Sequence, residues 1–349
     1  HKIINNYQNN NLNDKALNLY NELISFDEKR NFKDAKIYNE IYKLKLENEI
    51  SYNFNLYFNS LEENKKEISD NPLITSVMAL QAKLLNDSET VDFKKILDIC
   101  DEAIALFPNS IGAKQCESMR SEILEKELKF SMQTVVVANQ AIPANISYKN
   151  LTNPHYRIYE LSQNEVEDLA RLSKISIVKS LLQKEHIIEG HIDIPEETDY
   201  KEHSSLIALP KLGYGSYFIM FSKNEIFSDE ETELPAIHSF QVSNLSFVTT
   251  KNGQDLDIYV LDRETSAAVK DVNVNIYKQI YDYNNRQYVN VHITNLTTDK
   301  NGYAKISNIK ENGFFINLSK GDDKLISDSY FYNYQNDSDE KLRESTTFF

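Results

Sequence analysis

The first third of the chain carries apolar residues at helical spacing. Leu17, Tyr20 and Ile24 recur at three- and four-residue steps. Two further stripes between residues 93 and 123 are separated by Pro108, which cannot extend the first helix, and by Asn109 and Ser110, either of which can cap the second. This pattern predicts an antiparallel helix hairpin of roughly 34 to 38 residues, the size of one tetratricopeptide-type unit. Residues 14–47 have a similar pattern, so we predict a helical-repeat-like domain over residues 1–129.

The period changes after Phe130. Residues 133–138 are rich in β-branched side chains, residues 157–161 alternate, and residues 217–221 form a short apolar run. One stretch departs from this pattern, because apolar residues between 163 and 182 return to helical spacing. We predict an all-β domain over residues 130–239 with a helical insertion, ending near an acidic loop and Pro235.

The last segment gives the clearest strand signal. Apolar and polar residues alternate around residues 256–260, 272–276, 289–293 and 314–318, and Asn301-Gly302 suits a positive-φ turn. About seven short strands within this length are typical of a β-sandwich. The predicted fold is therefore a tetratricopeptide-like helical array followed by two antiparallel, immunoglobulin-like β-sandwiches, the second over residues 240–349.

Composition narrows the class of protein without naming an activity. The chain has 349 residues and a formal net charge of −15, which argues against a nucleic-acid-binding protein. No apolar stretch approaches the roughly 20 residues that a membrane-spanning helix needs. The charge is spread along all three predicted domains, as on an ordinary solvated surface.

Motifs for catalysis, cofactors and metals are missing from the sequence. There is no GxSxG, no phosphate-binding glycine loop and no HExxH, so we expect no catalytic, cofactor-binding or metal-ligating residues and no cofactor. His186, His191 and His203 fall in one segment, but surface or strand histidines explain them. Asp322 and Asp323 could act as acidic ligands, although a polar loop explains them equally well.

Two cysteines flank the predicted hairpin turn at equal distances. Cys100 and Cys116 lie eight residues on either side of Pro108, and equidistant residues of an antiparallel helix pair come close. A disulfide is therefore possible and would stabilise the fold by about 3 kcal/mol in an oxidising compartment. The alternative is that both are small buried apolar residues facing one core.

Several phrases of the sequence resemble one family. Val242-Ser243-Asn244-Leu245 opens the last segment, and it is followed by the phrases Tyr259-Val260-Leu261-Asp262-Arg263-Glu264-Thr265 and Thr298-Asp299-Lys300-Asn301-Gly302-Tyr303. This series resembles the second macroglobulin-like domain of the bacterial alpha-2-macroglobulin family. Tyr156-Arg157-Ile158-Tyr159 and residues 210–221 resemble the first such domain. The hairpin around Pro108 is similar to the helical N-terminal region of very large bacterial members.

The resemblance implies a role within a larger protein. Members of this family trap proteases: a protease cuts a bait segment, the molecule rearranges, and in many members a Cys-x-Glu-Gln thioester couples to the protease. The nearest match in this chain, Cys100-Asp101-Glu102-Ala103, lacks the glutamine. The implied function is thus a non-catalytic N-terminal scaffold, with proteases as partners of the full-length protein and further macroglobulin-like domains downstream. The resemblance also implies export to the periplasm or cell envelope, with a membrane tether only through a missing N-terminal lipid anchor.

A second hypothesis assigns a different function to the same architecture. Helical repeats and β-sandwiches together also suit a cell-surface or periplasmic module that docks a protein or glycan partner. An enzyme, for instance a carbohydrate-active β-sandwich, is the third hypothesis.

Overall fold

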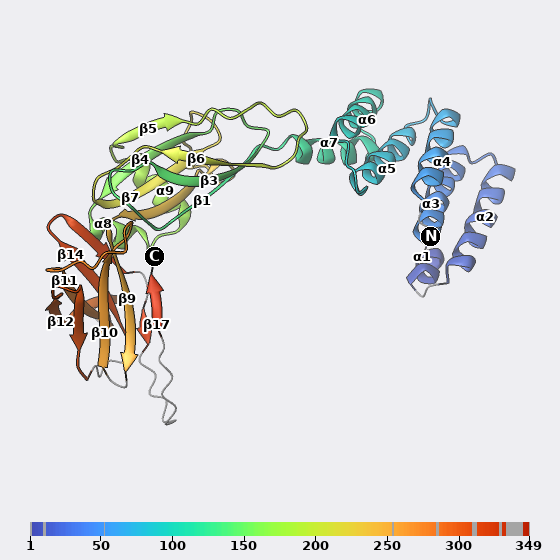
Figure 1. Cartoon of the computed structure of the whole chain (residues 1–349). Coiled ribbons are helices and arrows are strands. Elements are labelled where there is room, and N and C mark those ends of the chain that lie inside the picture. Colours follow the sequence, from blue (N-terminus) through green and yellow to red (C-terminus); the bar gives the residue numbers. More distant parts are fainter. Residues whose placement is uncertain are drawn as a thin grey trace. The chain divides into compact units, whose positions relative to one another are not determined.

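A computed structural model describes residues 2–9, 12–51, 53–252, 255–283, 286–308, 313–327, 330–332 and 345–348. The chain divides into two compact units, the first made of residues 1–126 with 197–201 and the second of residues 127–196 with 202–349. Figure 1 shows helices in the first unit and mostly strands in the second, as the sequence predicts. The fold class, helices followed by antiparallel β-sandwiches, is confirmed.

The first unit is a series of helices that pack in chain order. They are α1 (Lys2–Asn9), α2 (Asn13–Lys29), α3 (Lys33–Ser51), α4 (Phe54–Glu67), α5 (Ile74–Asn86), α6 (Phe93–Leu106) and α7 (Ile111–Leu124). The predicted hairpin is α6 and α7, and Ser110 is the N-cap of α7, accepting a hydrogen bond from the backbone N–H of Ala113. Tyr200, from the segment 197–201, packs against the core of this unit. The tetratricopeptide-type repeat stays a prediction.

The helices approach one another very closely at Gly112. A Cβ placed there would lie 2.1 Å from the backbone carbon of Thr75, at the N-terminus of α5. The Thr75 hydroxyl shares a hydrogen bond of 2.7 Å with the Ser110 hydroxyl. Because a real side chain cannot occupy that space, the close contact between α5 and α7 depends on glycine.

The first sandwich has two sheets in the second unit. The smaller sheet has the order β1-β3-β6, and the larger has the order β2-β8-β7-β4-β5. Their strands are β1 (Glu127–Met132), β2 (Val135–Val136), β3 (Ile142–Lys149), β4 (His155–Leu161), β5 (Ile188–His191), β6 (His203–Leu209), β7 (Gly215–Ser222) and β8 (Ala236–Val242). All pairs are antiparallel except β2 with β8, which run parallel. Ile142, Ile158 and Ile219 are fully buried members of the core.

The predicted helical insertion consists of two short helices. α8 (Gln163–Leu169) begins with a capping box in which Ser162 and Glu165 exchange hydrogen bonds, and α9 (Lys174–Leu182) begins at its own cap, Ser173. Each new cap satisfies backbone N–H groups of a new helix, so the apolar period of residues 163–182 is interrupted at the second serine. The short 3-10 helix η1 (Glu231–Glu233) follows in the acidic loop.

The second sandwich also has two sheets, ordered β13-β10-β9-β17 and β12-β11-β14-β15, with β16 paired to β14. Its strands are β9 (Leu245–Asn252), β10 (Asp255–Asp262), β11 (Asn273–Asp282), β12 (Gln287–Thr297), β13 (Tyr303–Ile306), β14 (Gly313–Lys320), β15 (Asp323–Ile326), β16 (Phe331–Tyr332) and β17 (Ser345–Phe348). Val260, Val274 and Ile316 fill its core.

A β-bulge divides the hairpin of β11 and β12. Ile276 pairs with Thr294 and Tyr277 with His292, so Ile293 is the extra residue. Both Ile293 and Leu296 pack against the core. The bulge therefore keeps the apolar residues of β12 inward on both sides of it and turns Asn290, His292 and Asn295 to the outer face.

Candidate functional site

The phrase that opens the second sandwich forms the joint between the two sandwiches of the second unit. β8 ends at Val242 and β9 begins at Leu245, so only Ser243 and Asn244 connect them. The side chain of Ser243 is fully buried. We call Ser243, Asn244 and the side chains that hydrogen-bond to them the joint.

Asp323 holds this dipeptide from the second sandwich. Its Oδ1 accepts a hydrogen bond of 2.6 Å from the Ser243 hydroxyl, and its Oδ2 accepts one of 3.1 Å from the Asn244 backbone N–H. Only 6% of Asp323 is exposed, and this burial raises the pKa of its carboxyl while the hydrogen bonds from Ser243 and Asn244 oppose the rise. The ionised form of the Asp323 carboxyl is therefore favoured by its two hydrogen-bond donors in the joint and disfavoured by its burial.

Arg263 fixes the same dipeptide through its carbonyl groups. The Arg263 Nε donates to the Ser243 carbonyl oxygen at 3.2 Å and its Nη2 to the Leu245 carbonyl oxygen at 2.7 Å. The Arg263 backbone N–H donates to the Asn244 carbonyl oxygen at 2.7 Å. Each backbone polar group of the short linker is thus satisfied internally.

The turn beside Arg263 is held by an acidic residue of the same phrase. The Asp262 Oδ1 accepts hydrogen bonds of 2.8 Å from both the backbone N–H and the hydroxyl of Thr265. Led by the hydrogen bond from the Thr265 backbone, these contacts lower the pKa of Asp262. Asp262 therefore has a structural role, because it holds the turn next to Arg263.

The first sandwich reaches the joint through amide side chains. Gln241, on β8, donates to the Ile326 carbonyl oxygen and accepts from the Ile326 backbone N–H, both at 2.8 Å. Asn244 Oδ1 accepts from the backbone N–H of Ala138 at 2.9 Å, and its Nδ2 donates to the Tyr214 hydroxyl at 3.2 Å. Loop residues of the first sandwich are consequently tied to Asn244, and β8 is tied to β15.

The third resembling phrase forms a turn near the core of the second sandwich. The Asp299 Oδ1 accepts from the backbone N–H groups of Asn301 and Tyr303, at 2.8 and 2.9 Å. Gly302 has a φ of +70°, and a Cβ there would lie 2.5 Å from the Val260 carbonyl oxygen. These residues, like those of the joint, make contacts that support the backbone.

The cysteine pair lies in the helical core. Cys100 and Cys116 are fully buried free thiols in the structure, and a side-chain hydrogen bond links them. This hydrogen bond and burial raise the pKa of Cys116. The disulfide stays a prediction, and Cys100 packs in the apolar core of the helical unit.

The histidines of the segment around residue 190 have ordinary partners. His186 Nε2 lies 3.0 Å from Glu189 Oε2, and His191 Nε2 lies 3.4 Å from Asp193 Oδ1. Within the described residues, no three His, Cys, Asp or Glu side chains are grouped to hold a metal ion. In the same part of the chain, no helix is long and apolar enough to cross a membrane.

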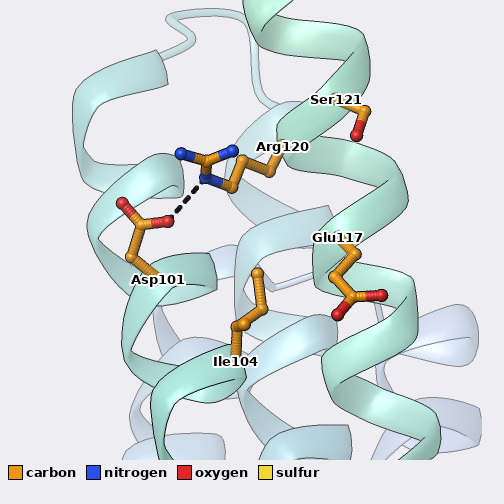
Figure 2. Close-up of a pocket in the computed structure, with 5 residues that line it drawn as sticks. All are labelled: Asp101, Ile104, Glu117, Arg120 and Ser121. Atoms are coloured by element: carbon orange, nitrogen blue, oxygen red, sulfur yellow. Dashed lines mark hydrogen bonds and ion pairs between the residues drawn. The ribbon is translucent and has the colours of Figure 1, made fainter. Parts of the chain in front are cut away.

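A shallow recess of about 300 Å³ lies between α6 and α7 and offers little chemistry. Figure 2 shows its lining residues, Asp101, Ile104, Glu117, Arg120 and Ser121. Arg120 Nε lies 2.7 Å from Asp101 Oδ1, so this guanidinium is already paired with a carboxylate. The recess contains surface side chains and no nucleophile placed beside a base.

Comparisons with known proteins give structural matches alone. No protein-family model and no curated protein matches the sequence. The structure of Escherichia coli alpha-2-macroglobulin spanning its domains MG0, NIE and MG1 is similar, with 14% identity and a TM-score of 0.40 over 58% of this chain and 64% of that one. An E. coli structure spanning NIE and MG1 matches with 15% identity and a TM-score of 0.39, over 58% of this chain and 95% of that one.

A Salmonella alpha-2-macroglobulin variant matches with 11% identity and a TM-score of 0.38, over 58% of this chain and 12% of that one. The matching part thus spans from about an eighth to almost all of those chains. All three are structures of bacterial alpha-2-macroglobulins.

Proposed function

We propose that this chain is a non-catalytic N-terminal scaffold of a bacterial alpha-2-macroglobulin-like, protease-trapping inhibitor. The observation that carries the proposal is the joint. The residues that resemble the family, Ser243, Asn244 and Arg263, meet in one partly buried hydrogen-bond network and hold two β-sandwiches together. Such a role needs precise geometry between domains and no reacting group.

The proposal divides the activity between this chain and the rest of the inhibitor. Bait cleavage and covalent capture belong to segments outside this chain, because Cys100 is buried in a helix and its phrase lacks the glutamine of a thioester. Proteases and downstream macroglobulin-like domains are the proposed partners. We propose that the inhibitor is exported to the periplasm or the cell envelope.

The experiment compares this chain with the longer protein proposed to contain it. Trypsin mixed with the longer protein is expected to lose activity towards casein while it keeps activity towards a small peptide substrate, since a trapped protease still admits small molecules. The chain of residues 1–349 alone is expected to change neither activity. Trapping by this chain alone, or equal inhibition of both substrates by the longer protein, would contradict the proposal.

A further inference from the structure

The outward face of the sheet β12-β11-β14 lacks charged side chains. Every outward position in the register of β11 and its two neighbours is Asn, Gln, Ser, Thr, His, Tyr or Phe. The chain as a whole is 26% charged with a net charge of −15. The first charged side chain in this register is Lys324 on β15, opposite Ser319. An uncharged face of this length on an acidic protein points to an uncharged ligand.

Aromatic rings form a row along this face. Tyr277 stacks on Phe315 with ring centroids 6.0 Å apart and an interplanar angle of 14°, and His292 lies against it edge-on at 5.3 Å. Further along, Tyr281 and Tyr288 are directly paired across the strands, with centroids 5.1 Å apart. Tyr288 is 57% and Tyr281 40% exposed, so their rings are available to a ligand.

Carboxamides separate and flank the two groups of rings. Gln279 pairs with Asn290 between them, and on the other side of Tyr277 the register places Asn295, Asn275 and Asn317 in one row. Each carboxamide offers two donor hydrogens and one acceptor oxygen. Gln279, Asn290 and Asn295 are exposed. Such groups complement hydroxyls, which also donate and accept.

From this arrangement we propose that the face binds a neutral oligosaccharide. The apolar C–H faces of sugar rings would lie on the tyrosines, and the sugar hydroxyls would hydrogen-bond to the carboxamides; sheet faces of other small β-folds bind oligosaccharides as well. Tyr277 and Tyr281 are four residues apart on one strand, about 13 Å, so a ligand that touches both must be longer than one sugar ring.

The composition favours a glycan over a protein partner. Protein interfaces are enriched in Met and Arg beside aromatic residues and bury aliphatic side chains at their centre. None of the outward positions on β12, β11 and β14 in this register holds Met, Arg, Leu, Ile or Val. The absence of both cations and carboxylates also leaves acidic polysaccharides without a counter-charge.

The test is native affinity electrophoresis of the chain in gels containing neutral polysaccharides, namely hydroxyethylcellulose, xyloglucan and galactomannan, with alginate as the acidic comparison. We expect retardation by at least one neutral polysaccharide and none by alginate. Free migration in all neutral gels, or retardation by alginate alone, would overturn the proposal.

Two variants separate the rings from the carboxamides. Tyr281→Ala with Tyr288→Ala, and separately Asn290→Asp, should each weaken retardation at least ten-fold, since the second removes two donors and adds a charge at nearly constant shape. The matched control is Tyr259→Ala on β10, which removes a 41% exposed tyrosine paired to Tyr303 on the other sheet and should change nothing. Retardation that survives in both test variants, or loss that is equal in the control, would overturn the site.

A further measurement distinguishes a protein partner. Sedimentation of the chain alone reports whether the face pairs with a second copy. Self-association that the double tyrosine variant abolishes, without any glycan retardation, would mean that the face binds protein and the proposal is wrong. A circular dichroism melt of each variant confirms that the second sandwich is folded.

Discussion

Replacing Asp323 with alanine should loosen the joint. The variant removes the acceptor for the Ser243 hydroxyl and for the Asn244 backbone N–H, at 2.6 and 3.1 Å. Both donors lie in a linker whose serine is fully buried, so they would be left without that partner.

The expected magnitude follows from the number and kind of these bonds. A hydrogen bond to a charged group contributes about 1.5–3 kcal/mol, so two would total roughly 3–6 kcal/mol. Burial raises the pKa of Asp323, which means that the ionised carboxylate already costs free energy at neutral pH, and removing it regains part of the loss. We therefore expect Asp323→Ala to lower the free energy of unfolding by about 2–4 kcal/mol.

Two measurements check this value. Thermal unfolding, followed by far-ultraviolet circular dichroism, should shift to lower temperature by about 5–15 °C, at about 2–4 °C for each kcal/mol in a unit of this size. Hydrogen exchange followed by mass spectrometry should show faster exchange in a peptide that contains Asn244, because its amide loses its acceptor.

The neighbouring residue provides the matched control. Asp322 is exposed, so Asp322→Ala should change stability by no more than about 0.5 kcal/mol. In a double-mutant cycle, Ser243→Ala should be coupled to Asp323→Ala by at least about 0.5 kcal/mol. An Asp323→Ala chain that melts like the Asp322→Ala chain, with unchanged exchange near Asn244, would refute the role assigned to this carboxylate.

Two other predictions test the helices. Gly112→Ala should destabilise the helical unit by about 2 kcal/mol or more, because the new Cβ would lie 2.1 Å from the Thr75 backbone. The control is Gly213→Ala, whose new Cβ has no atom within 4 Å and which should leave urea unfolding, followed at 222 nm, unchanged. Equal unfolding midpoints for the two variants would contradict the close approach. Glu165 accepts hydrogen bonds from Lys184 at 2.5 Å and from Ser162, which lower its pKa from 4.5 to about 2. A depressed pKa means that this stabilisation is complete above pH 4.5 and disappears as the pH falls towards 2. Glu165→Gln should therefore flatten the pH dependence of the melting temperature between these two pH values. An NMR titration that gives Glu165 an ordinary pKa would contradict this prediction.

Local patterns in the sequence predicted much of the fold. The alternation at residues 272–276 and 314–318 gave β11 and β14, because their inward residues have to share one core. Pro108 and Ser110 marked the turn between α6 and α7, since one cannot continue a helix and the other can cap one. These signals depend only on neighbouring residues.

The bulge of β12 corresponds to a feature of the sequence that a strict two-residue alternation does not include. Val289, Val291 and Ile293 follow a period of two, but the next apolar residue is Leu296, a step of three. A step of three is what one extra residue produces when the strand continues to face the same core. That step of three places Asn295 on the outer face together with His292.

Asp323 shows why the joint could not be predicted. Beside Asp322 in the sequence, it has the composition of a polar loop, and nothing local distinguishes the exposed aspartate from the buried one. Its burial depends on Ser243, which lies 80 residues away in the chain. The contact exists only after both sandwiches have formed, so the hydropathy pattern along the chain does not predict it.

The chemistry of the joint explains why the second sandwich has a recognisable opening phrase. An apolar contact tolerates sliding, whereas a buried hydrogen bond is satisfied only at a narrow range of distances and angles. The linker between β8 and β9 is fixed by Asp323 and Arg263, and beside it Gln241 ties β8 to β15 through Ile326. Each of these side chains satisfies donors or acceptors at defined positions. Side chains of equal volume would fill the same space without fixing the angle between the sandwiches. The polar residues of the joint therefore restrict the angle between the two sandwiches more narrowly than apolar contacts alone would.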